Sequence, residues 1–143
     1  MLRVARYDEP VPQTPRESSY PGERLGRPPS GAGSIARVGR RLAALAIDWA
    51  CATVISIAFF RYDALATLTV FAIVQVVFIP LIGGSPGHRI MGLRLERMTG
   101  GWVGLWRPIL RTALLVVVIP AVIWDPDQRG LHDKAAGTVL VRV

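Results

Sequence analysis

Residues 42–60 read LAALAIDWACATVISIAFF, an apolar run of 19 residues that is interrupted only by Asp48. At about 1.5 Å of rise per residue, a helix of this length spans roughly 28 Å, close to the hydrocarbon thickness of about 30 Å. The run therefore predicts a membrane-spanning helix. Arg37, Arg40 and Arg41 stand just before it. Basic residues favour the cytoplasmic side, so we expect a cytoplasmic N-terminus.

A second apolar run covers residues 64–82 and comes after the three-residue turn Arg61-Tyr62-Asp63. So short a connection predicts that the two helices form an antiparallel hairpin. We expect a multi-pass protein of the plasma (inner) membrane. In fold class it should be an all-α integral membrane protein with two spanning helices.

The bulk composition supports this class. The net charge is +7 and the mean hydropathy is positive, a combination expected when apolar spans and basic flanks occupy separate blocks. The basic charge then serves topology, and we expect no nucleic-acid partner. Cys51 is the only cysteine and the two histidines lie far apart in sequence, so we expect no metal site and no cofactor. Lys134 is the only lysine, and this arginine bias suggests a high-GC bacterial genome.

The remaining segments organise the domain. Residues 1–36 are polar and rich in Pro, Gly and Ser, which predicts a disordered cytoplasmic tail before a membrane domain at 37–143. Residues 83–108 should form a cytoplasmic loop. Within that loop Gly92–Met98 is a candidate strand. It could form a hairpin with Trp102-Val103 or pair with the candidate strand Thr138–Val143, giving a small cytoplasmic β-ribbon.

The third apolar segment, residues 109–124, is short for a span and contains Pro120. It fits a short re-entrant helix better than a crossing one. A re-entrant helix would keep both candidate strands on one side of the membrane, whereas a crossing helix would separate them. Residues 125–143 form the C-terminal segment.

Asp48 is the most informative residue, because a carboxylate deep in a membrane helix costs roughly 2.5–3.5 kcal/mol. It shares a helix face with Arg41, seven residues earlier, and with a seam of small residues at Ala44, Ala52 and Ser56; such a seam allows close helix contact. Gln75 should lie at the same depth on the antiparallel helix, which predicts an Asp48–Gln75 hydrogen bond. Arg41 and Arg111 are candidate counter-charges. Asp48 is an interhelical clamp, a proton or cation site, or a contact with a partner subunit.

Two further clusters carry candidate chemistry. The Gly-rich stretch 84–89 could hold a phosphate, although it lacks the ending of a nucleotide P-loop. The basic residues in and after this stretch favour anionic lipid head groups; they are His88, Arg89, Arg94 and Arg97. His132 adjoins Asp133, but no nucleophile stands in a recognisable pattern with them, so we expect no catalytic residue and no enzyme. Asp133 could instead cap a turn or pair with an arginine of residues 88–97.

Taken together, these motifs resemble the RDD family of bacterial membrane proteins, in a form typical of high-GC actinobacteria. The family is named for one arginine and two aspartates, to which Arg41, Asp48 and Asp133 are similar. Residues 85–95, SPGHRIMGLRL, resemble the family's Pro-Gly-basic-Arg segment, with His88 where lysine is more usual. The resemblance covers about residues 34–143. It implies a membrane domain with paired polar residues; the family's function is generally unassigned, with transport suggested.

We therefore expect a non-enzymatic accessory or scaffold subunit whose partners are membrane lipids and either another membrane protein or a second copy of itself. Two or three helices are too few to enclose a solvated pathway alone. Two alternatives remain open. One is proton or cation transport by an oligomer that uses Asp48, and the other is anionic lipid binding through the basic loop.

Overall fold

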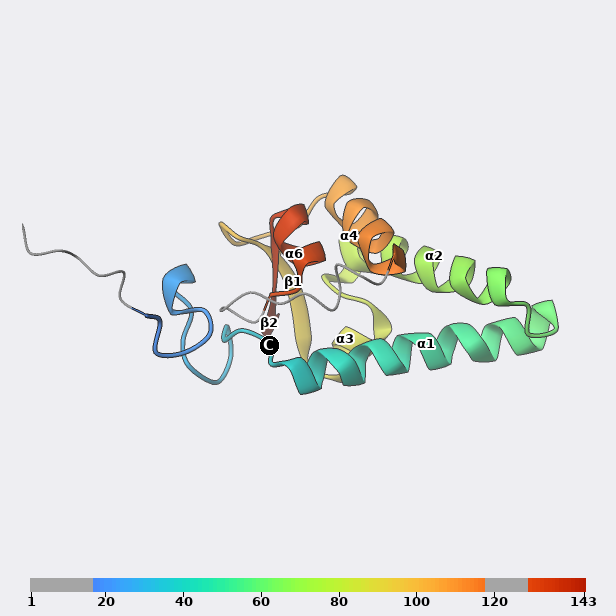
Figure 1. Ribbon diagram of the computed structural model, residues 1–143, viewed down its shortest axis with the longest axis horizontal. Helices are drawn as coiled ribbons and strands as arrows, with labels where there is room; N and C mark the ends of the chain where they lie inside the picture. The colour runs from blue at the N-terminus through green and yellow to red at the C-terminus, as the bar shows by residue number, and fades with distance from the viewer. Residues whose placement is uncertain (1–16, 118–128) are drawn as a thin grey trace, which may run out of the picture.

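The computed structural model describes residues 17–117 and 129–143. Two long antiparallel helices, α1 (Val38–Phe60) and α2 (Ala64–Ile82), extend from one end of a smaller cap (Figure 1). Both are long and apolar enough to cross a membrane, by length and composition. The bounds of α2 are those predicted. The α1 helix begins at Val38 rather than at residue 42, because Arg40 and Arg41 in its first turn bond to the Met91 carbonyl oxygen and to Asp133.

The hairpin turn is tight. Arg61 and Tyr62 adopt left-handed backbone conformations, with φ of 54° and 60°. The next residue, Asp63, caps α2 by accepting a hydrogen bond from the backbone N–H of Ala66 at 2.7 Å. A carboxylate at this position satisfies a backbone donor that the helix itself cannot.

Within residues 83–117 and 129–143, the cap contains three short helices and a two-stranded sheet. In chain order these elements are α3 (Pro86–Ile90), β1 (Leu93–Arg97), α4 (Trp106–Val117), α6 (Leu131–Ala136) and β2 (Thr138–Arg142). The strands β1 and β2 are antiparallel, with Leu93 opposite Arg142. The predicted ribbon with the C-terminal strand is thus confirmed. The predicted hairpin with Trp102-Val103 is wrong, because the second edge of β1 bonds instead to Gly83, whose carbonyl oxygen accepts from the Leu95 N–H at 2.7 Å, and to Gly101, whose carbonyl oxygen accepts from the Arg97 N–H at 3.3 Å.

The core of the cap joins the sheet to the long helices. Leu93, Leu95 and Leu140 from the sheet pack with Ala44 of α1 and Ile79 of α2, and all five are at most 2% exposed. Burial of this shared apolar surface holds the cap against one end of the hairpin.

The predicted disordered tail is too long at its C-terminal end. Residues 1–16 lie outside the described residues, but Glu23–Leu25 form a short 3-10 helix, η1. Ile35 bridges Val141, and Ala36 donates a backbone hydrogen bond to Leu140 at 2.8 Å. Ile35 and Ala36 are apolar residues at the end of a polar stretch. The composition of residues 1–36 as a whole is polar, and it therefore predicted disorder for these two residues as well.

The third apolar segment is described in part. The α4 helix begins at Trp106 and is described to Val117, packing against α2 and α6. Residues 118–124 of the predicted helix lie outside the described residues, and the re-entrant path stays a prediction.

Candidate functional site

Arg41, Asp48 and Ser56 face inward on one side of α1. The buried positions are Arg41, Ala44, Asp48, Ala52 and Ser56, which confirms the predicted shared face. The short helix α3 approaches this seam closely at Gly87. A Cβ added at Gly87 would overlap the carbonyl oxygen of Ala44, so glycine is required for the contact.

Asp48 lies at the centre of the first polar site and is 1% exposed. Its carboxylate accepts hydrogen bonds from Gln75 Nε2 at 2.8 Å, Ser85 Oγ at 2.5 Å and the backbone N–H of Gly87 at 2.7 Å. The predicted Asp48–Gln75 hydrogen bond is confirmed. The predicted counter-charges are wrong, because both arginines pair with Asp133 instead. Three uncharged donors, from α2 and from the start of α3, hold Asp48.

The Gly-rich stretch therefore holds an anion that belongs to the chain itself. Ser85 caps α3, accepting from the His88 backbone N–H at 3.3 Å, and Pro86 stands at the first helical position. Sequence reasoning missed Ser85 and Gly87 as partners of Asp48. The Ser-Pro pair is a helix-start signal that could have revealed α3.

His88 is 5% exposed, so its predicted contact with lipid head groups is wrong. Its Nδ1 accepts a hydrogen bond from the Ser85 backbone N–H at 3.1 Å, which completes a capping box. Burial, followed by the positive charge of Arg111, lowers the pKa of His88 to about 3. The imidazole is therefore neutral near pH 7, and with Nδ1 accepting, the ring hydrogen belongs on Nε2. Of the other residues predicted to contact lipids, Arg89 and Arg94 are exposed and Arg97 is half-buried.

Asp133 lies at the centre of the second polar site, on α6, and is fully buried. Arg41 Nη1 lies 2.8 Å from one carboxylate oxygen, and Arg111 Nε lies 2.6 Å from the other. His132 Nε2 lies 3.5 Å from the latter oxygen. Asp133 thus joins α1 to α4, rather than pairing with an arginine of residues 88–97. The sequence predicted Arg111 as a counter-charge for Asp48, whereas in the structure it pairs with Asp133.

Burial alone would raise the pKa of Asp133, but the surrounding charges outweigh it. The Arg111 guanidinium, then His132 and Arg41, hold the pKa of this carboxyl well below its usual range. Two guanidinium groups face one carboxylate, so the arginine–aspartate trio carries one net positive charge. Asp133 is therefore ionised across the physiological pH range.

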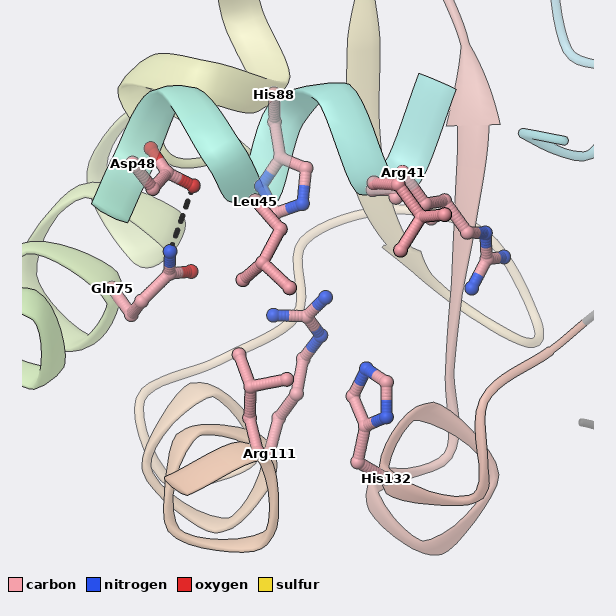
Figure 2. A pocket seen from close by; sticks show the side chains of 10 residues that line it. Arg41, Leu45, Asp48, Gln75, His88, Arg111 and His132 are labelled. Carbon is pink, nitrogen blue, oxygen red and sulfur yellow. Dashed lines mark hydrogen bonds between the residues drawn. The ribbon is translucent and has the colours of Figure 1, made fainter. Parts of the chain in front are cut away.

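A cavity of about 50 Å³ lies between the two polar sites. Figure 2 shows Asp48 and Gln75 on one side of it, Arg41 and His132 on the other, and Arg111 reaching up from α4. At roughly 10–15 Å³ per water position, the cavity has room for about three to five waters. Within the described residues, no group of three or more metal-ligating side chains is found.

Comparison of the chain with protein-family models, with curated proteins and with solved structures finds no match.

Proposed function

We propose that the chain is a multi-pass protein of the plasma (inner) membrane, of RDD type. In this proposal it acts as a non-enzymatic accessory or scaffold subunit, and its N-terminus is cytoplasmic. The observation that carries the proposal is the internal saturation of both buried aspartates. Asp48 accepts three hydrogen bonds from the chain, and Asp133 pairs with two arginines. Carboxylates held in this way fix the packing of the helices. Few of their oxygen lone pairs remain to bind and release a proton, an ion or a substrate.

The uncovered surface of the hairpin supports the membrane placement. Apolar side chains on the hairpin are widely exposed, both beside the turn, where Phe59 is 78% and Leu65 73% exposed, and next to the cap, where Leu81 is 74% exposed. Exposed apolar surface of this extent is stable in lipid or against another membrane protein. The internal clamps then present the hairpin to its surroundings as a rigid unit.

The strand pairing supports the re-entrant reading of residues 109–124. β1 comes after the hairpin and β2 ends the chain, and the two pair along five residues. In a bilayer, both strands would lie on one side, and the segment between them would have to return to that side. A reporter fused after Val143 is expected to give a cytoplasmic signal; a periplasmic signal would contradict this topology.

The first test is extraction of the full chain in a mild detergent, followed by affinity purification and native mass measurement. A second protein in stoichiometric amount would support the accessory-subunit proposal. A clean homo-oligomer would favour the alternative of proton or cation transport by an oligomer. The next measurement would then be ion flux in liposomes. Flux that Asp48→Asn abolishes without loss of folding would replace the scaffold proposal.

Binding of anionic lipids is a second candidate, because exposed basic residues cluster around the cap. Arg37 and Arg40 at the start of α1 are exposed together with Arg89 and Arg94. Each is expected to contribute on the order of 1 kcal/mol near an anionic surface. Arg89→Glu with Arg94→Glu should weaken association with anionic vesicles while the helical content stays unchanged; equal association would exclude this role.

A further inference from the structure

The cavity between the two polar sites contains a buried cation with unused hydrogen-bonding capacity. The Arg111 side chain is 5% exposed, and its Nε is committed to Asp133. Its Nη1 has no hydrogen-bond partner among the described residues. Figure 2 shows the guanidinium directed into the space below Leu45. A buried guanidinium nitrogen without an acceptor is costly, so this position favours an acceptor brought by a ligand or by water.

The charge around Arg111 selects the sign of that acceptor. Arg41 and Arg111 share one carboxylate, which leaves a positive charge at this end of the cavity. The negative charge of Asp48 lies at the other end, where three donors hold its oxygens. An anionic group is therefore favoured beside Arg111. Because the cavity measures about 50 Å³, the group must be small and carry no bulky substituent. A terminal carboxylate meets this requirement, whereas a phosphodiester does not.

An apolar groove adjoins the cavity. It measures about 400 Å³ and runs between α1, α2 and α4. Leu42, Leu45 and Leu115 line both the groove and the cavity, and Trp49 and Phe71 continue the groove along the hairpin. Polar atoms contribute little to its walls. A chain of methylene groups is the chemistry that such walls accept.

We infer that the groove and cavity together bind a fatty acid, with its acyl chain between α1, α2 and α4 and its carboxylate on Arg111 Nη1. The inference rests on the proposed membrane placement, because the chain would enter the groove from the bilayer. The carboxylate supplies the missing acceptor, and it lies at the end of the cavity where Arg41, Arg111 and Asp133 together carry one positive charge. Leu42, Leu45 and Leu115, which line both the groove and the cavity, surround the point where the carboxylate joins the acyl chain.

The test uses the full-length protein in a neutral maltoside detergent, with palmitate as the probe and native mass spectrometry as the measurement. We expect a one-to-one palmitate adduct. Hexadecanol has the same chain without the charge and should bind at least about tenfold more weakly, because a hydrogen bond between two charged groups is stronger than one to a neutral hydroxyl. Equal binding of the two probes would overturn the role of Arg111.

A groove-filling variant tests the chain position without touching either aspartate. Ala46 is exposed and lines the groove but not the cavity, so Ala46→Trp should reduce palmitate binding by about tenfold or more. Ala58→Trp makes the same change at an exposed position of α1 outside the groove and should bind as the unmodified protein does. Binding that survives Ala46→Trp, or an absent palmitate adduct, would overturn the inference.

Resistance of the protein to carbonate extraction from membranes separates two kinds of failure. A membrane-integral protein without palmitate binding contradicts the fatty-acid site alone. A protein released by carbonate contradicts the membrane placement on which the site rests.

Discussion

Asp48 and Asp133 are both fully buried aspartates, yet the chain stabilises them in different ways. Uncharged donors surround Asp48: an amide, a hydroxyl and a backbone N–H. Two guanidinium groups surround Asp133. The difference lies in how far the partners can adapt. An amide or a hydroxyl can reorient to donate or accept, whereas a guanidinium has no acceptor.

The two sites also connect different parts of the molecule. The Asp48 site joins α1 to α2 and α3, along the hairpin. The Asp133 site joins α1 to α4 and α6, which closes the cap over the sheet. Loss of charge at each aspartate should therefore have different costs in the free energy of unfolding.

The largest effect is expected for Asp133→Asn. The variant leaves two buried guanidinium groups facing an amide, and breaking a buried ion pair by removing one partner costs about 3–5 kcal/mol. The measurement is the free energy of unfolding in detergent by denaturant titration. A loss below about 1 kcal/mol would show that the arginines reach other acceptors, and the contrast between the two sites would fail.

Gly87→Ala should have the next largest effect and acts on the Asp48 site through its backbone donor. The added Cβ would overlap the Ala44 carbonyl oxygen and lie 2.9 Å from Asp48 Cγ. Backbone must shift to relieve this overlap, which predicts a loss of about 3 kcal/mol in the free energy of unfolding.

Gly39→Ala is the matched control for this change. Gly39 lies in α1, and an added Cβ there meets nothing within 4 Å. The variant should be neutral or more stable by up to about 1 kcal/mol, because alanine favours helix. Equal destabilisation by both alanines would mean that the close approach of α3 contributes nothing specific.

Helix periodicity and the matched positions of residues on two antiparallel helices were enough to predict part of the structure from the sequence. The bounds of α2, the inward face of α1 and the Asp48–Gln75 hydrogen bond all depend on helix geometry and on two antiparallel helices of known register. The partners of Asp133 depend on how the cap closes. Arg41 and Asp133 are 92 residues apart in sequence, and nothing local specifies their pairing. The close contact of Gly87 with α1 could likewise not be predicted, because the sequence does not distinguish a glycine required by close packing from a glycine in a loop.

Acid should weaken the fold through His88. Its folded pKa of about 3 lies below the ordinary value of 6.5, so the unfolded chain takes up a proton that the folded chain excludes. Stability therefore falls as pH drops from about 6.5 toward 3. Between pH 7 and pH 5 the loss should be on the order of 1–2 kcal/mol. Asp133, whose folded pKa is depressed, adds its loss only below about pH 3.9.

His88→Gln isolates this contribution. Glutamine at the third helical position can still accept from the Ser85 backbone N–H, as in other capping boxes, but it does not titrate. His132 remains in both proteins, so the difference between their stabilities at pH 7 and pH 5 reports on His88. The same loss of stability in both proteins would assign the acid sensitivity elsewhere.

The smallest effect is expected for Asp48→Asn, and it tests the comparison most directly. The asparagine oxygen can still accept from the Gly87 N–H. Its new amide can donate to Gln75 after the glutamine amide turns, or to the Ser85 hydroxyl oxygen. The variant also removes a charge that is costly to bury. We therefore expect a loss of about 1 kcal/mol or less in the free energy of unfolding. A loss as large as that of Asp133→Asn would show that the charge of Asp48, and not its hydrogen-bonding shape, holds the hairpin to α3.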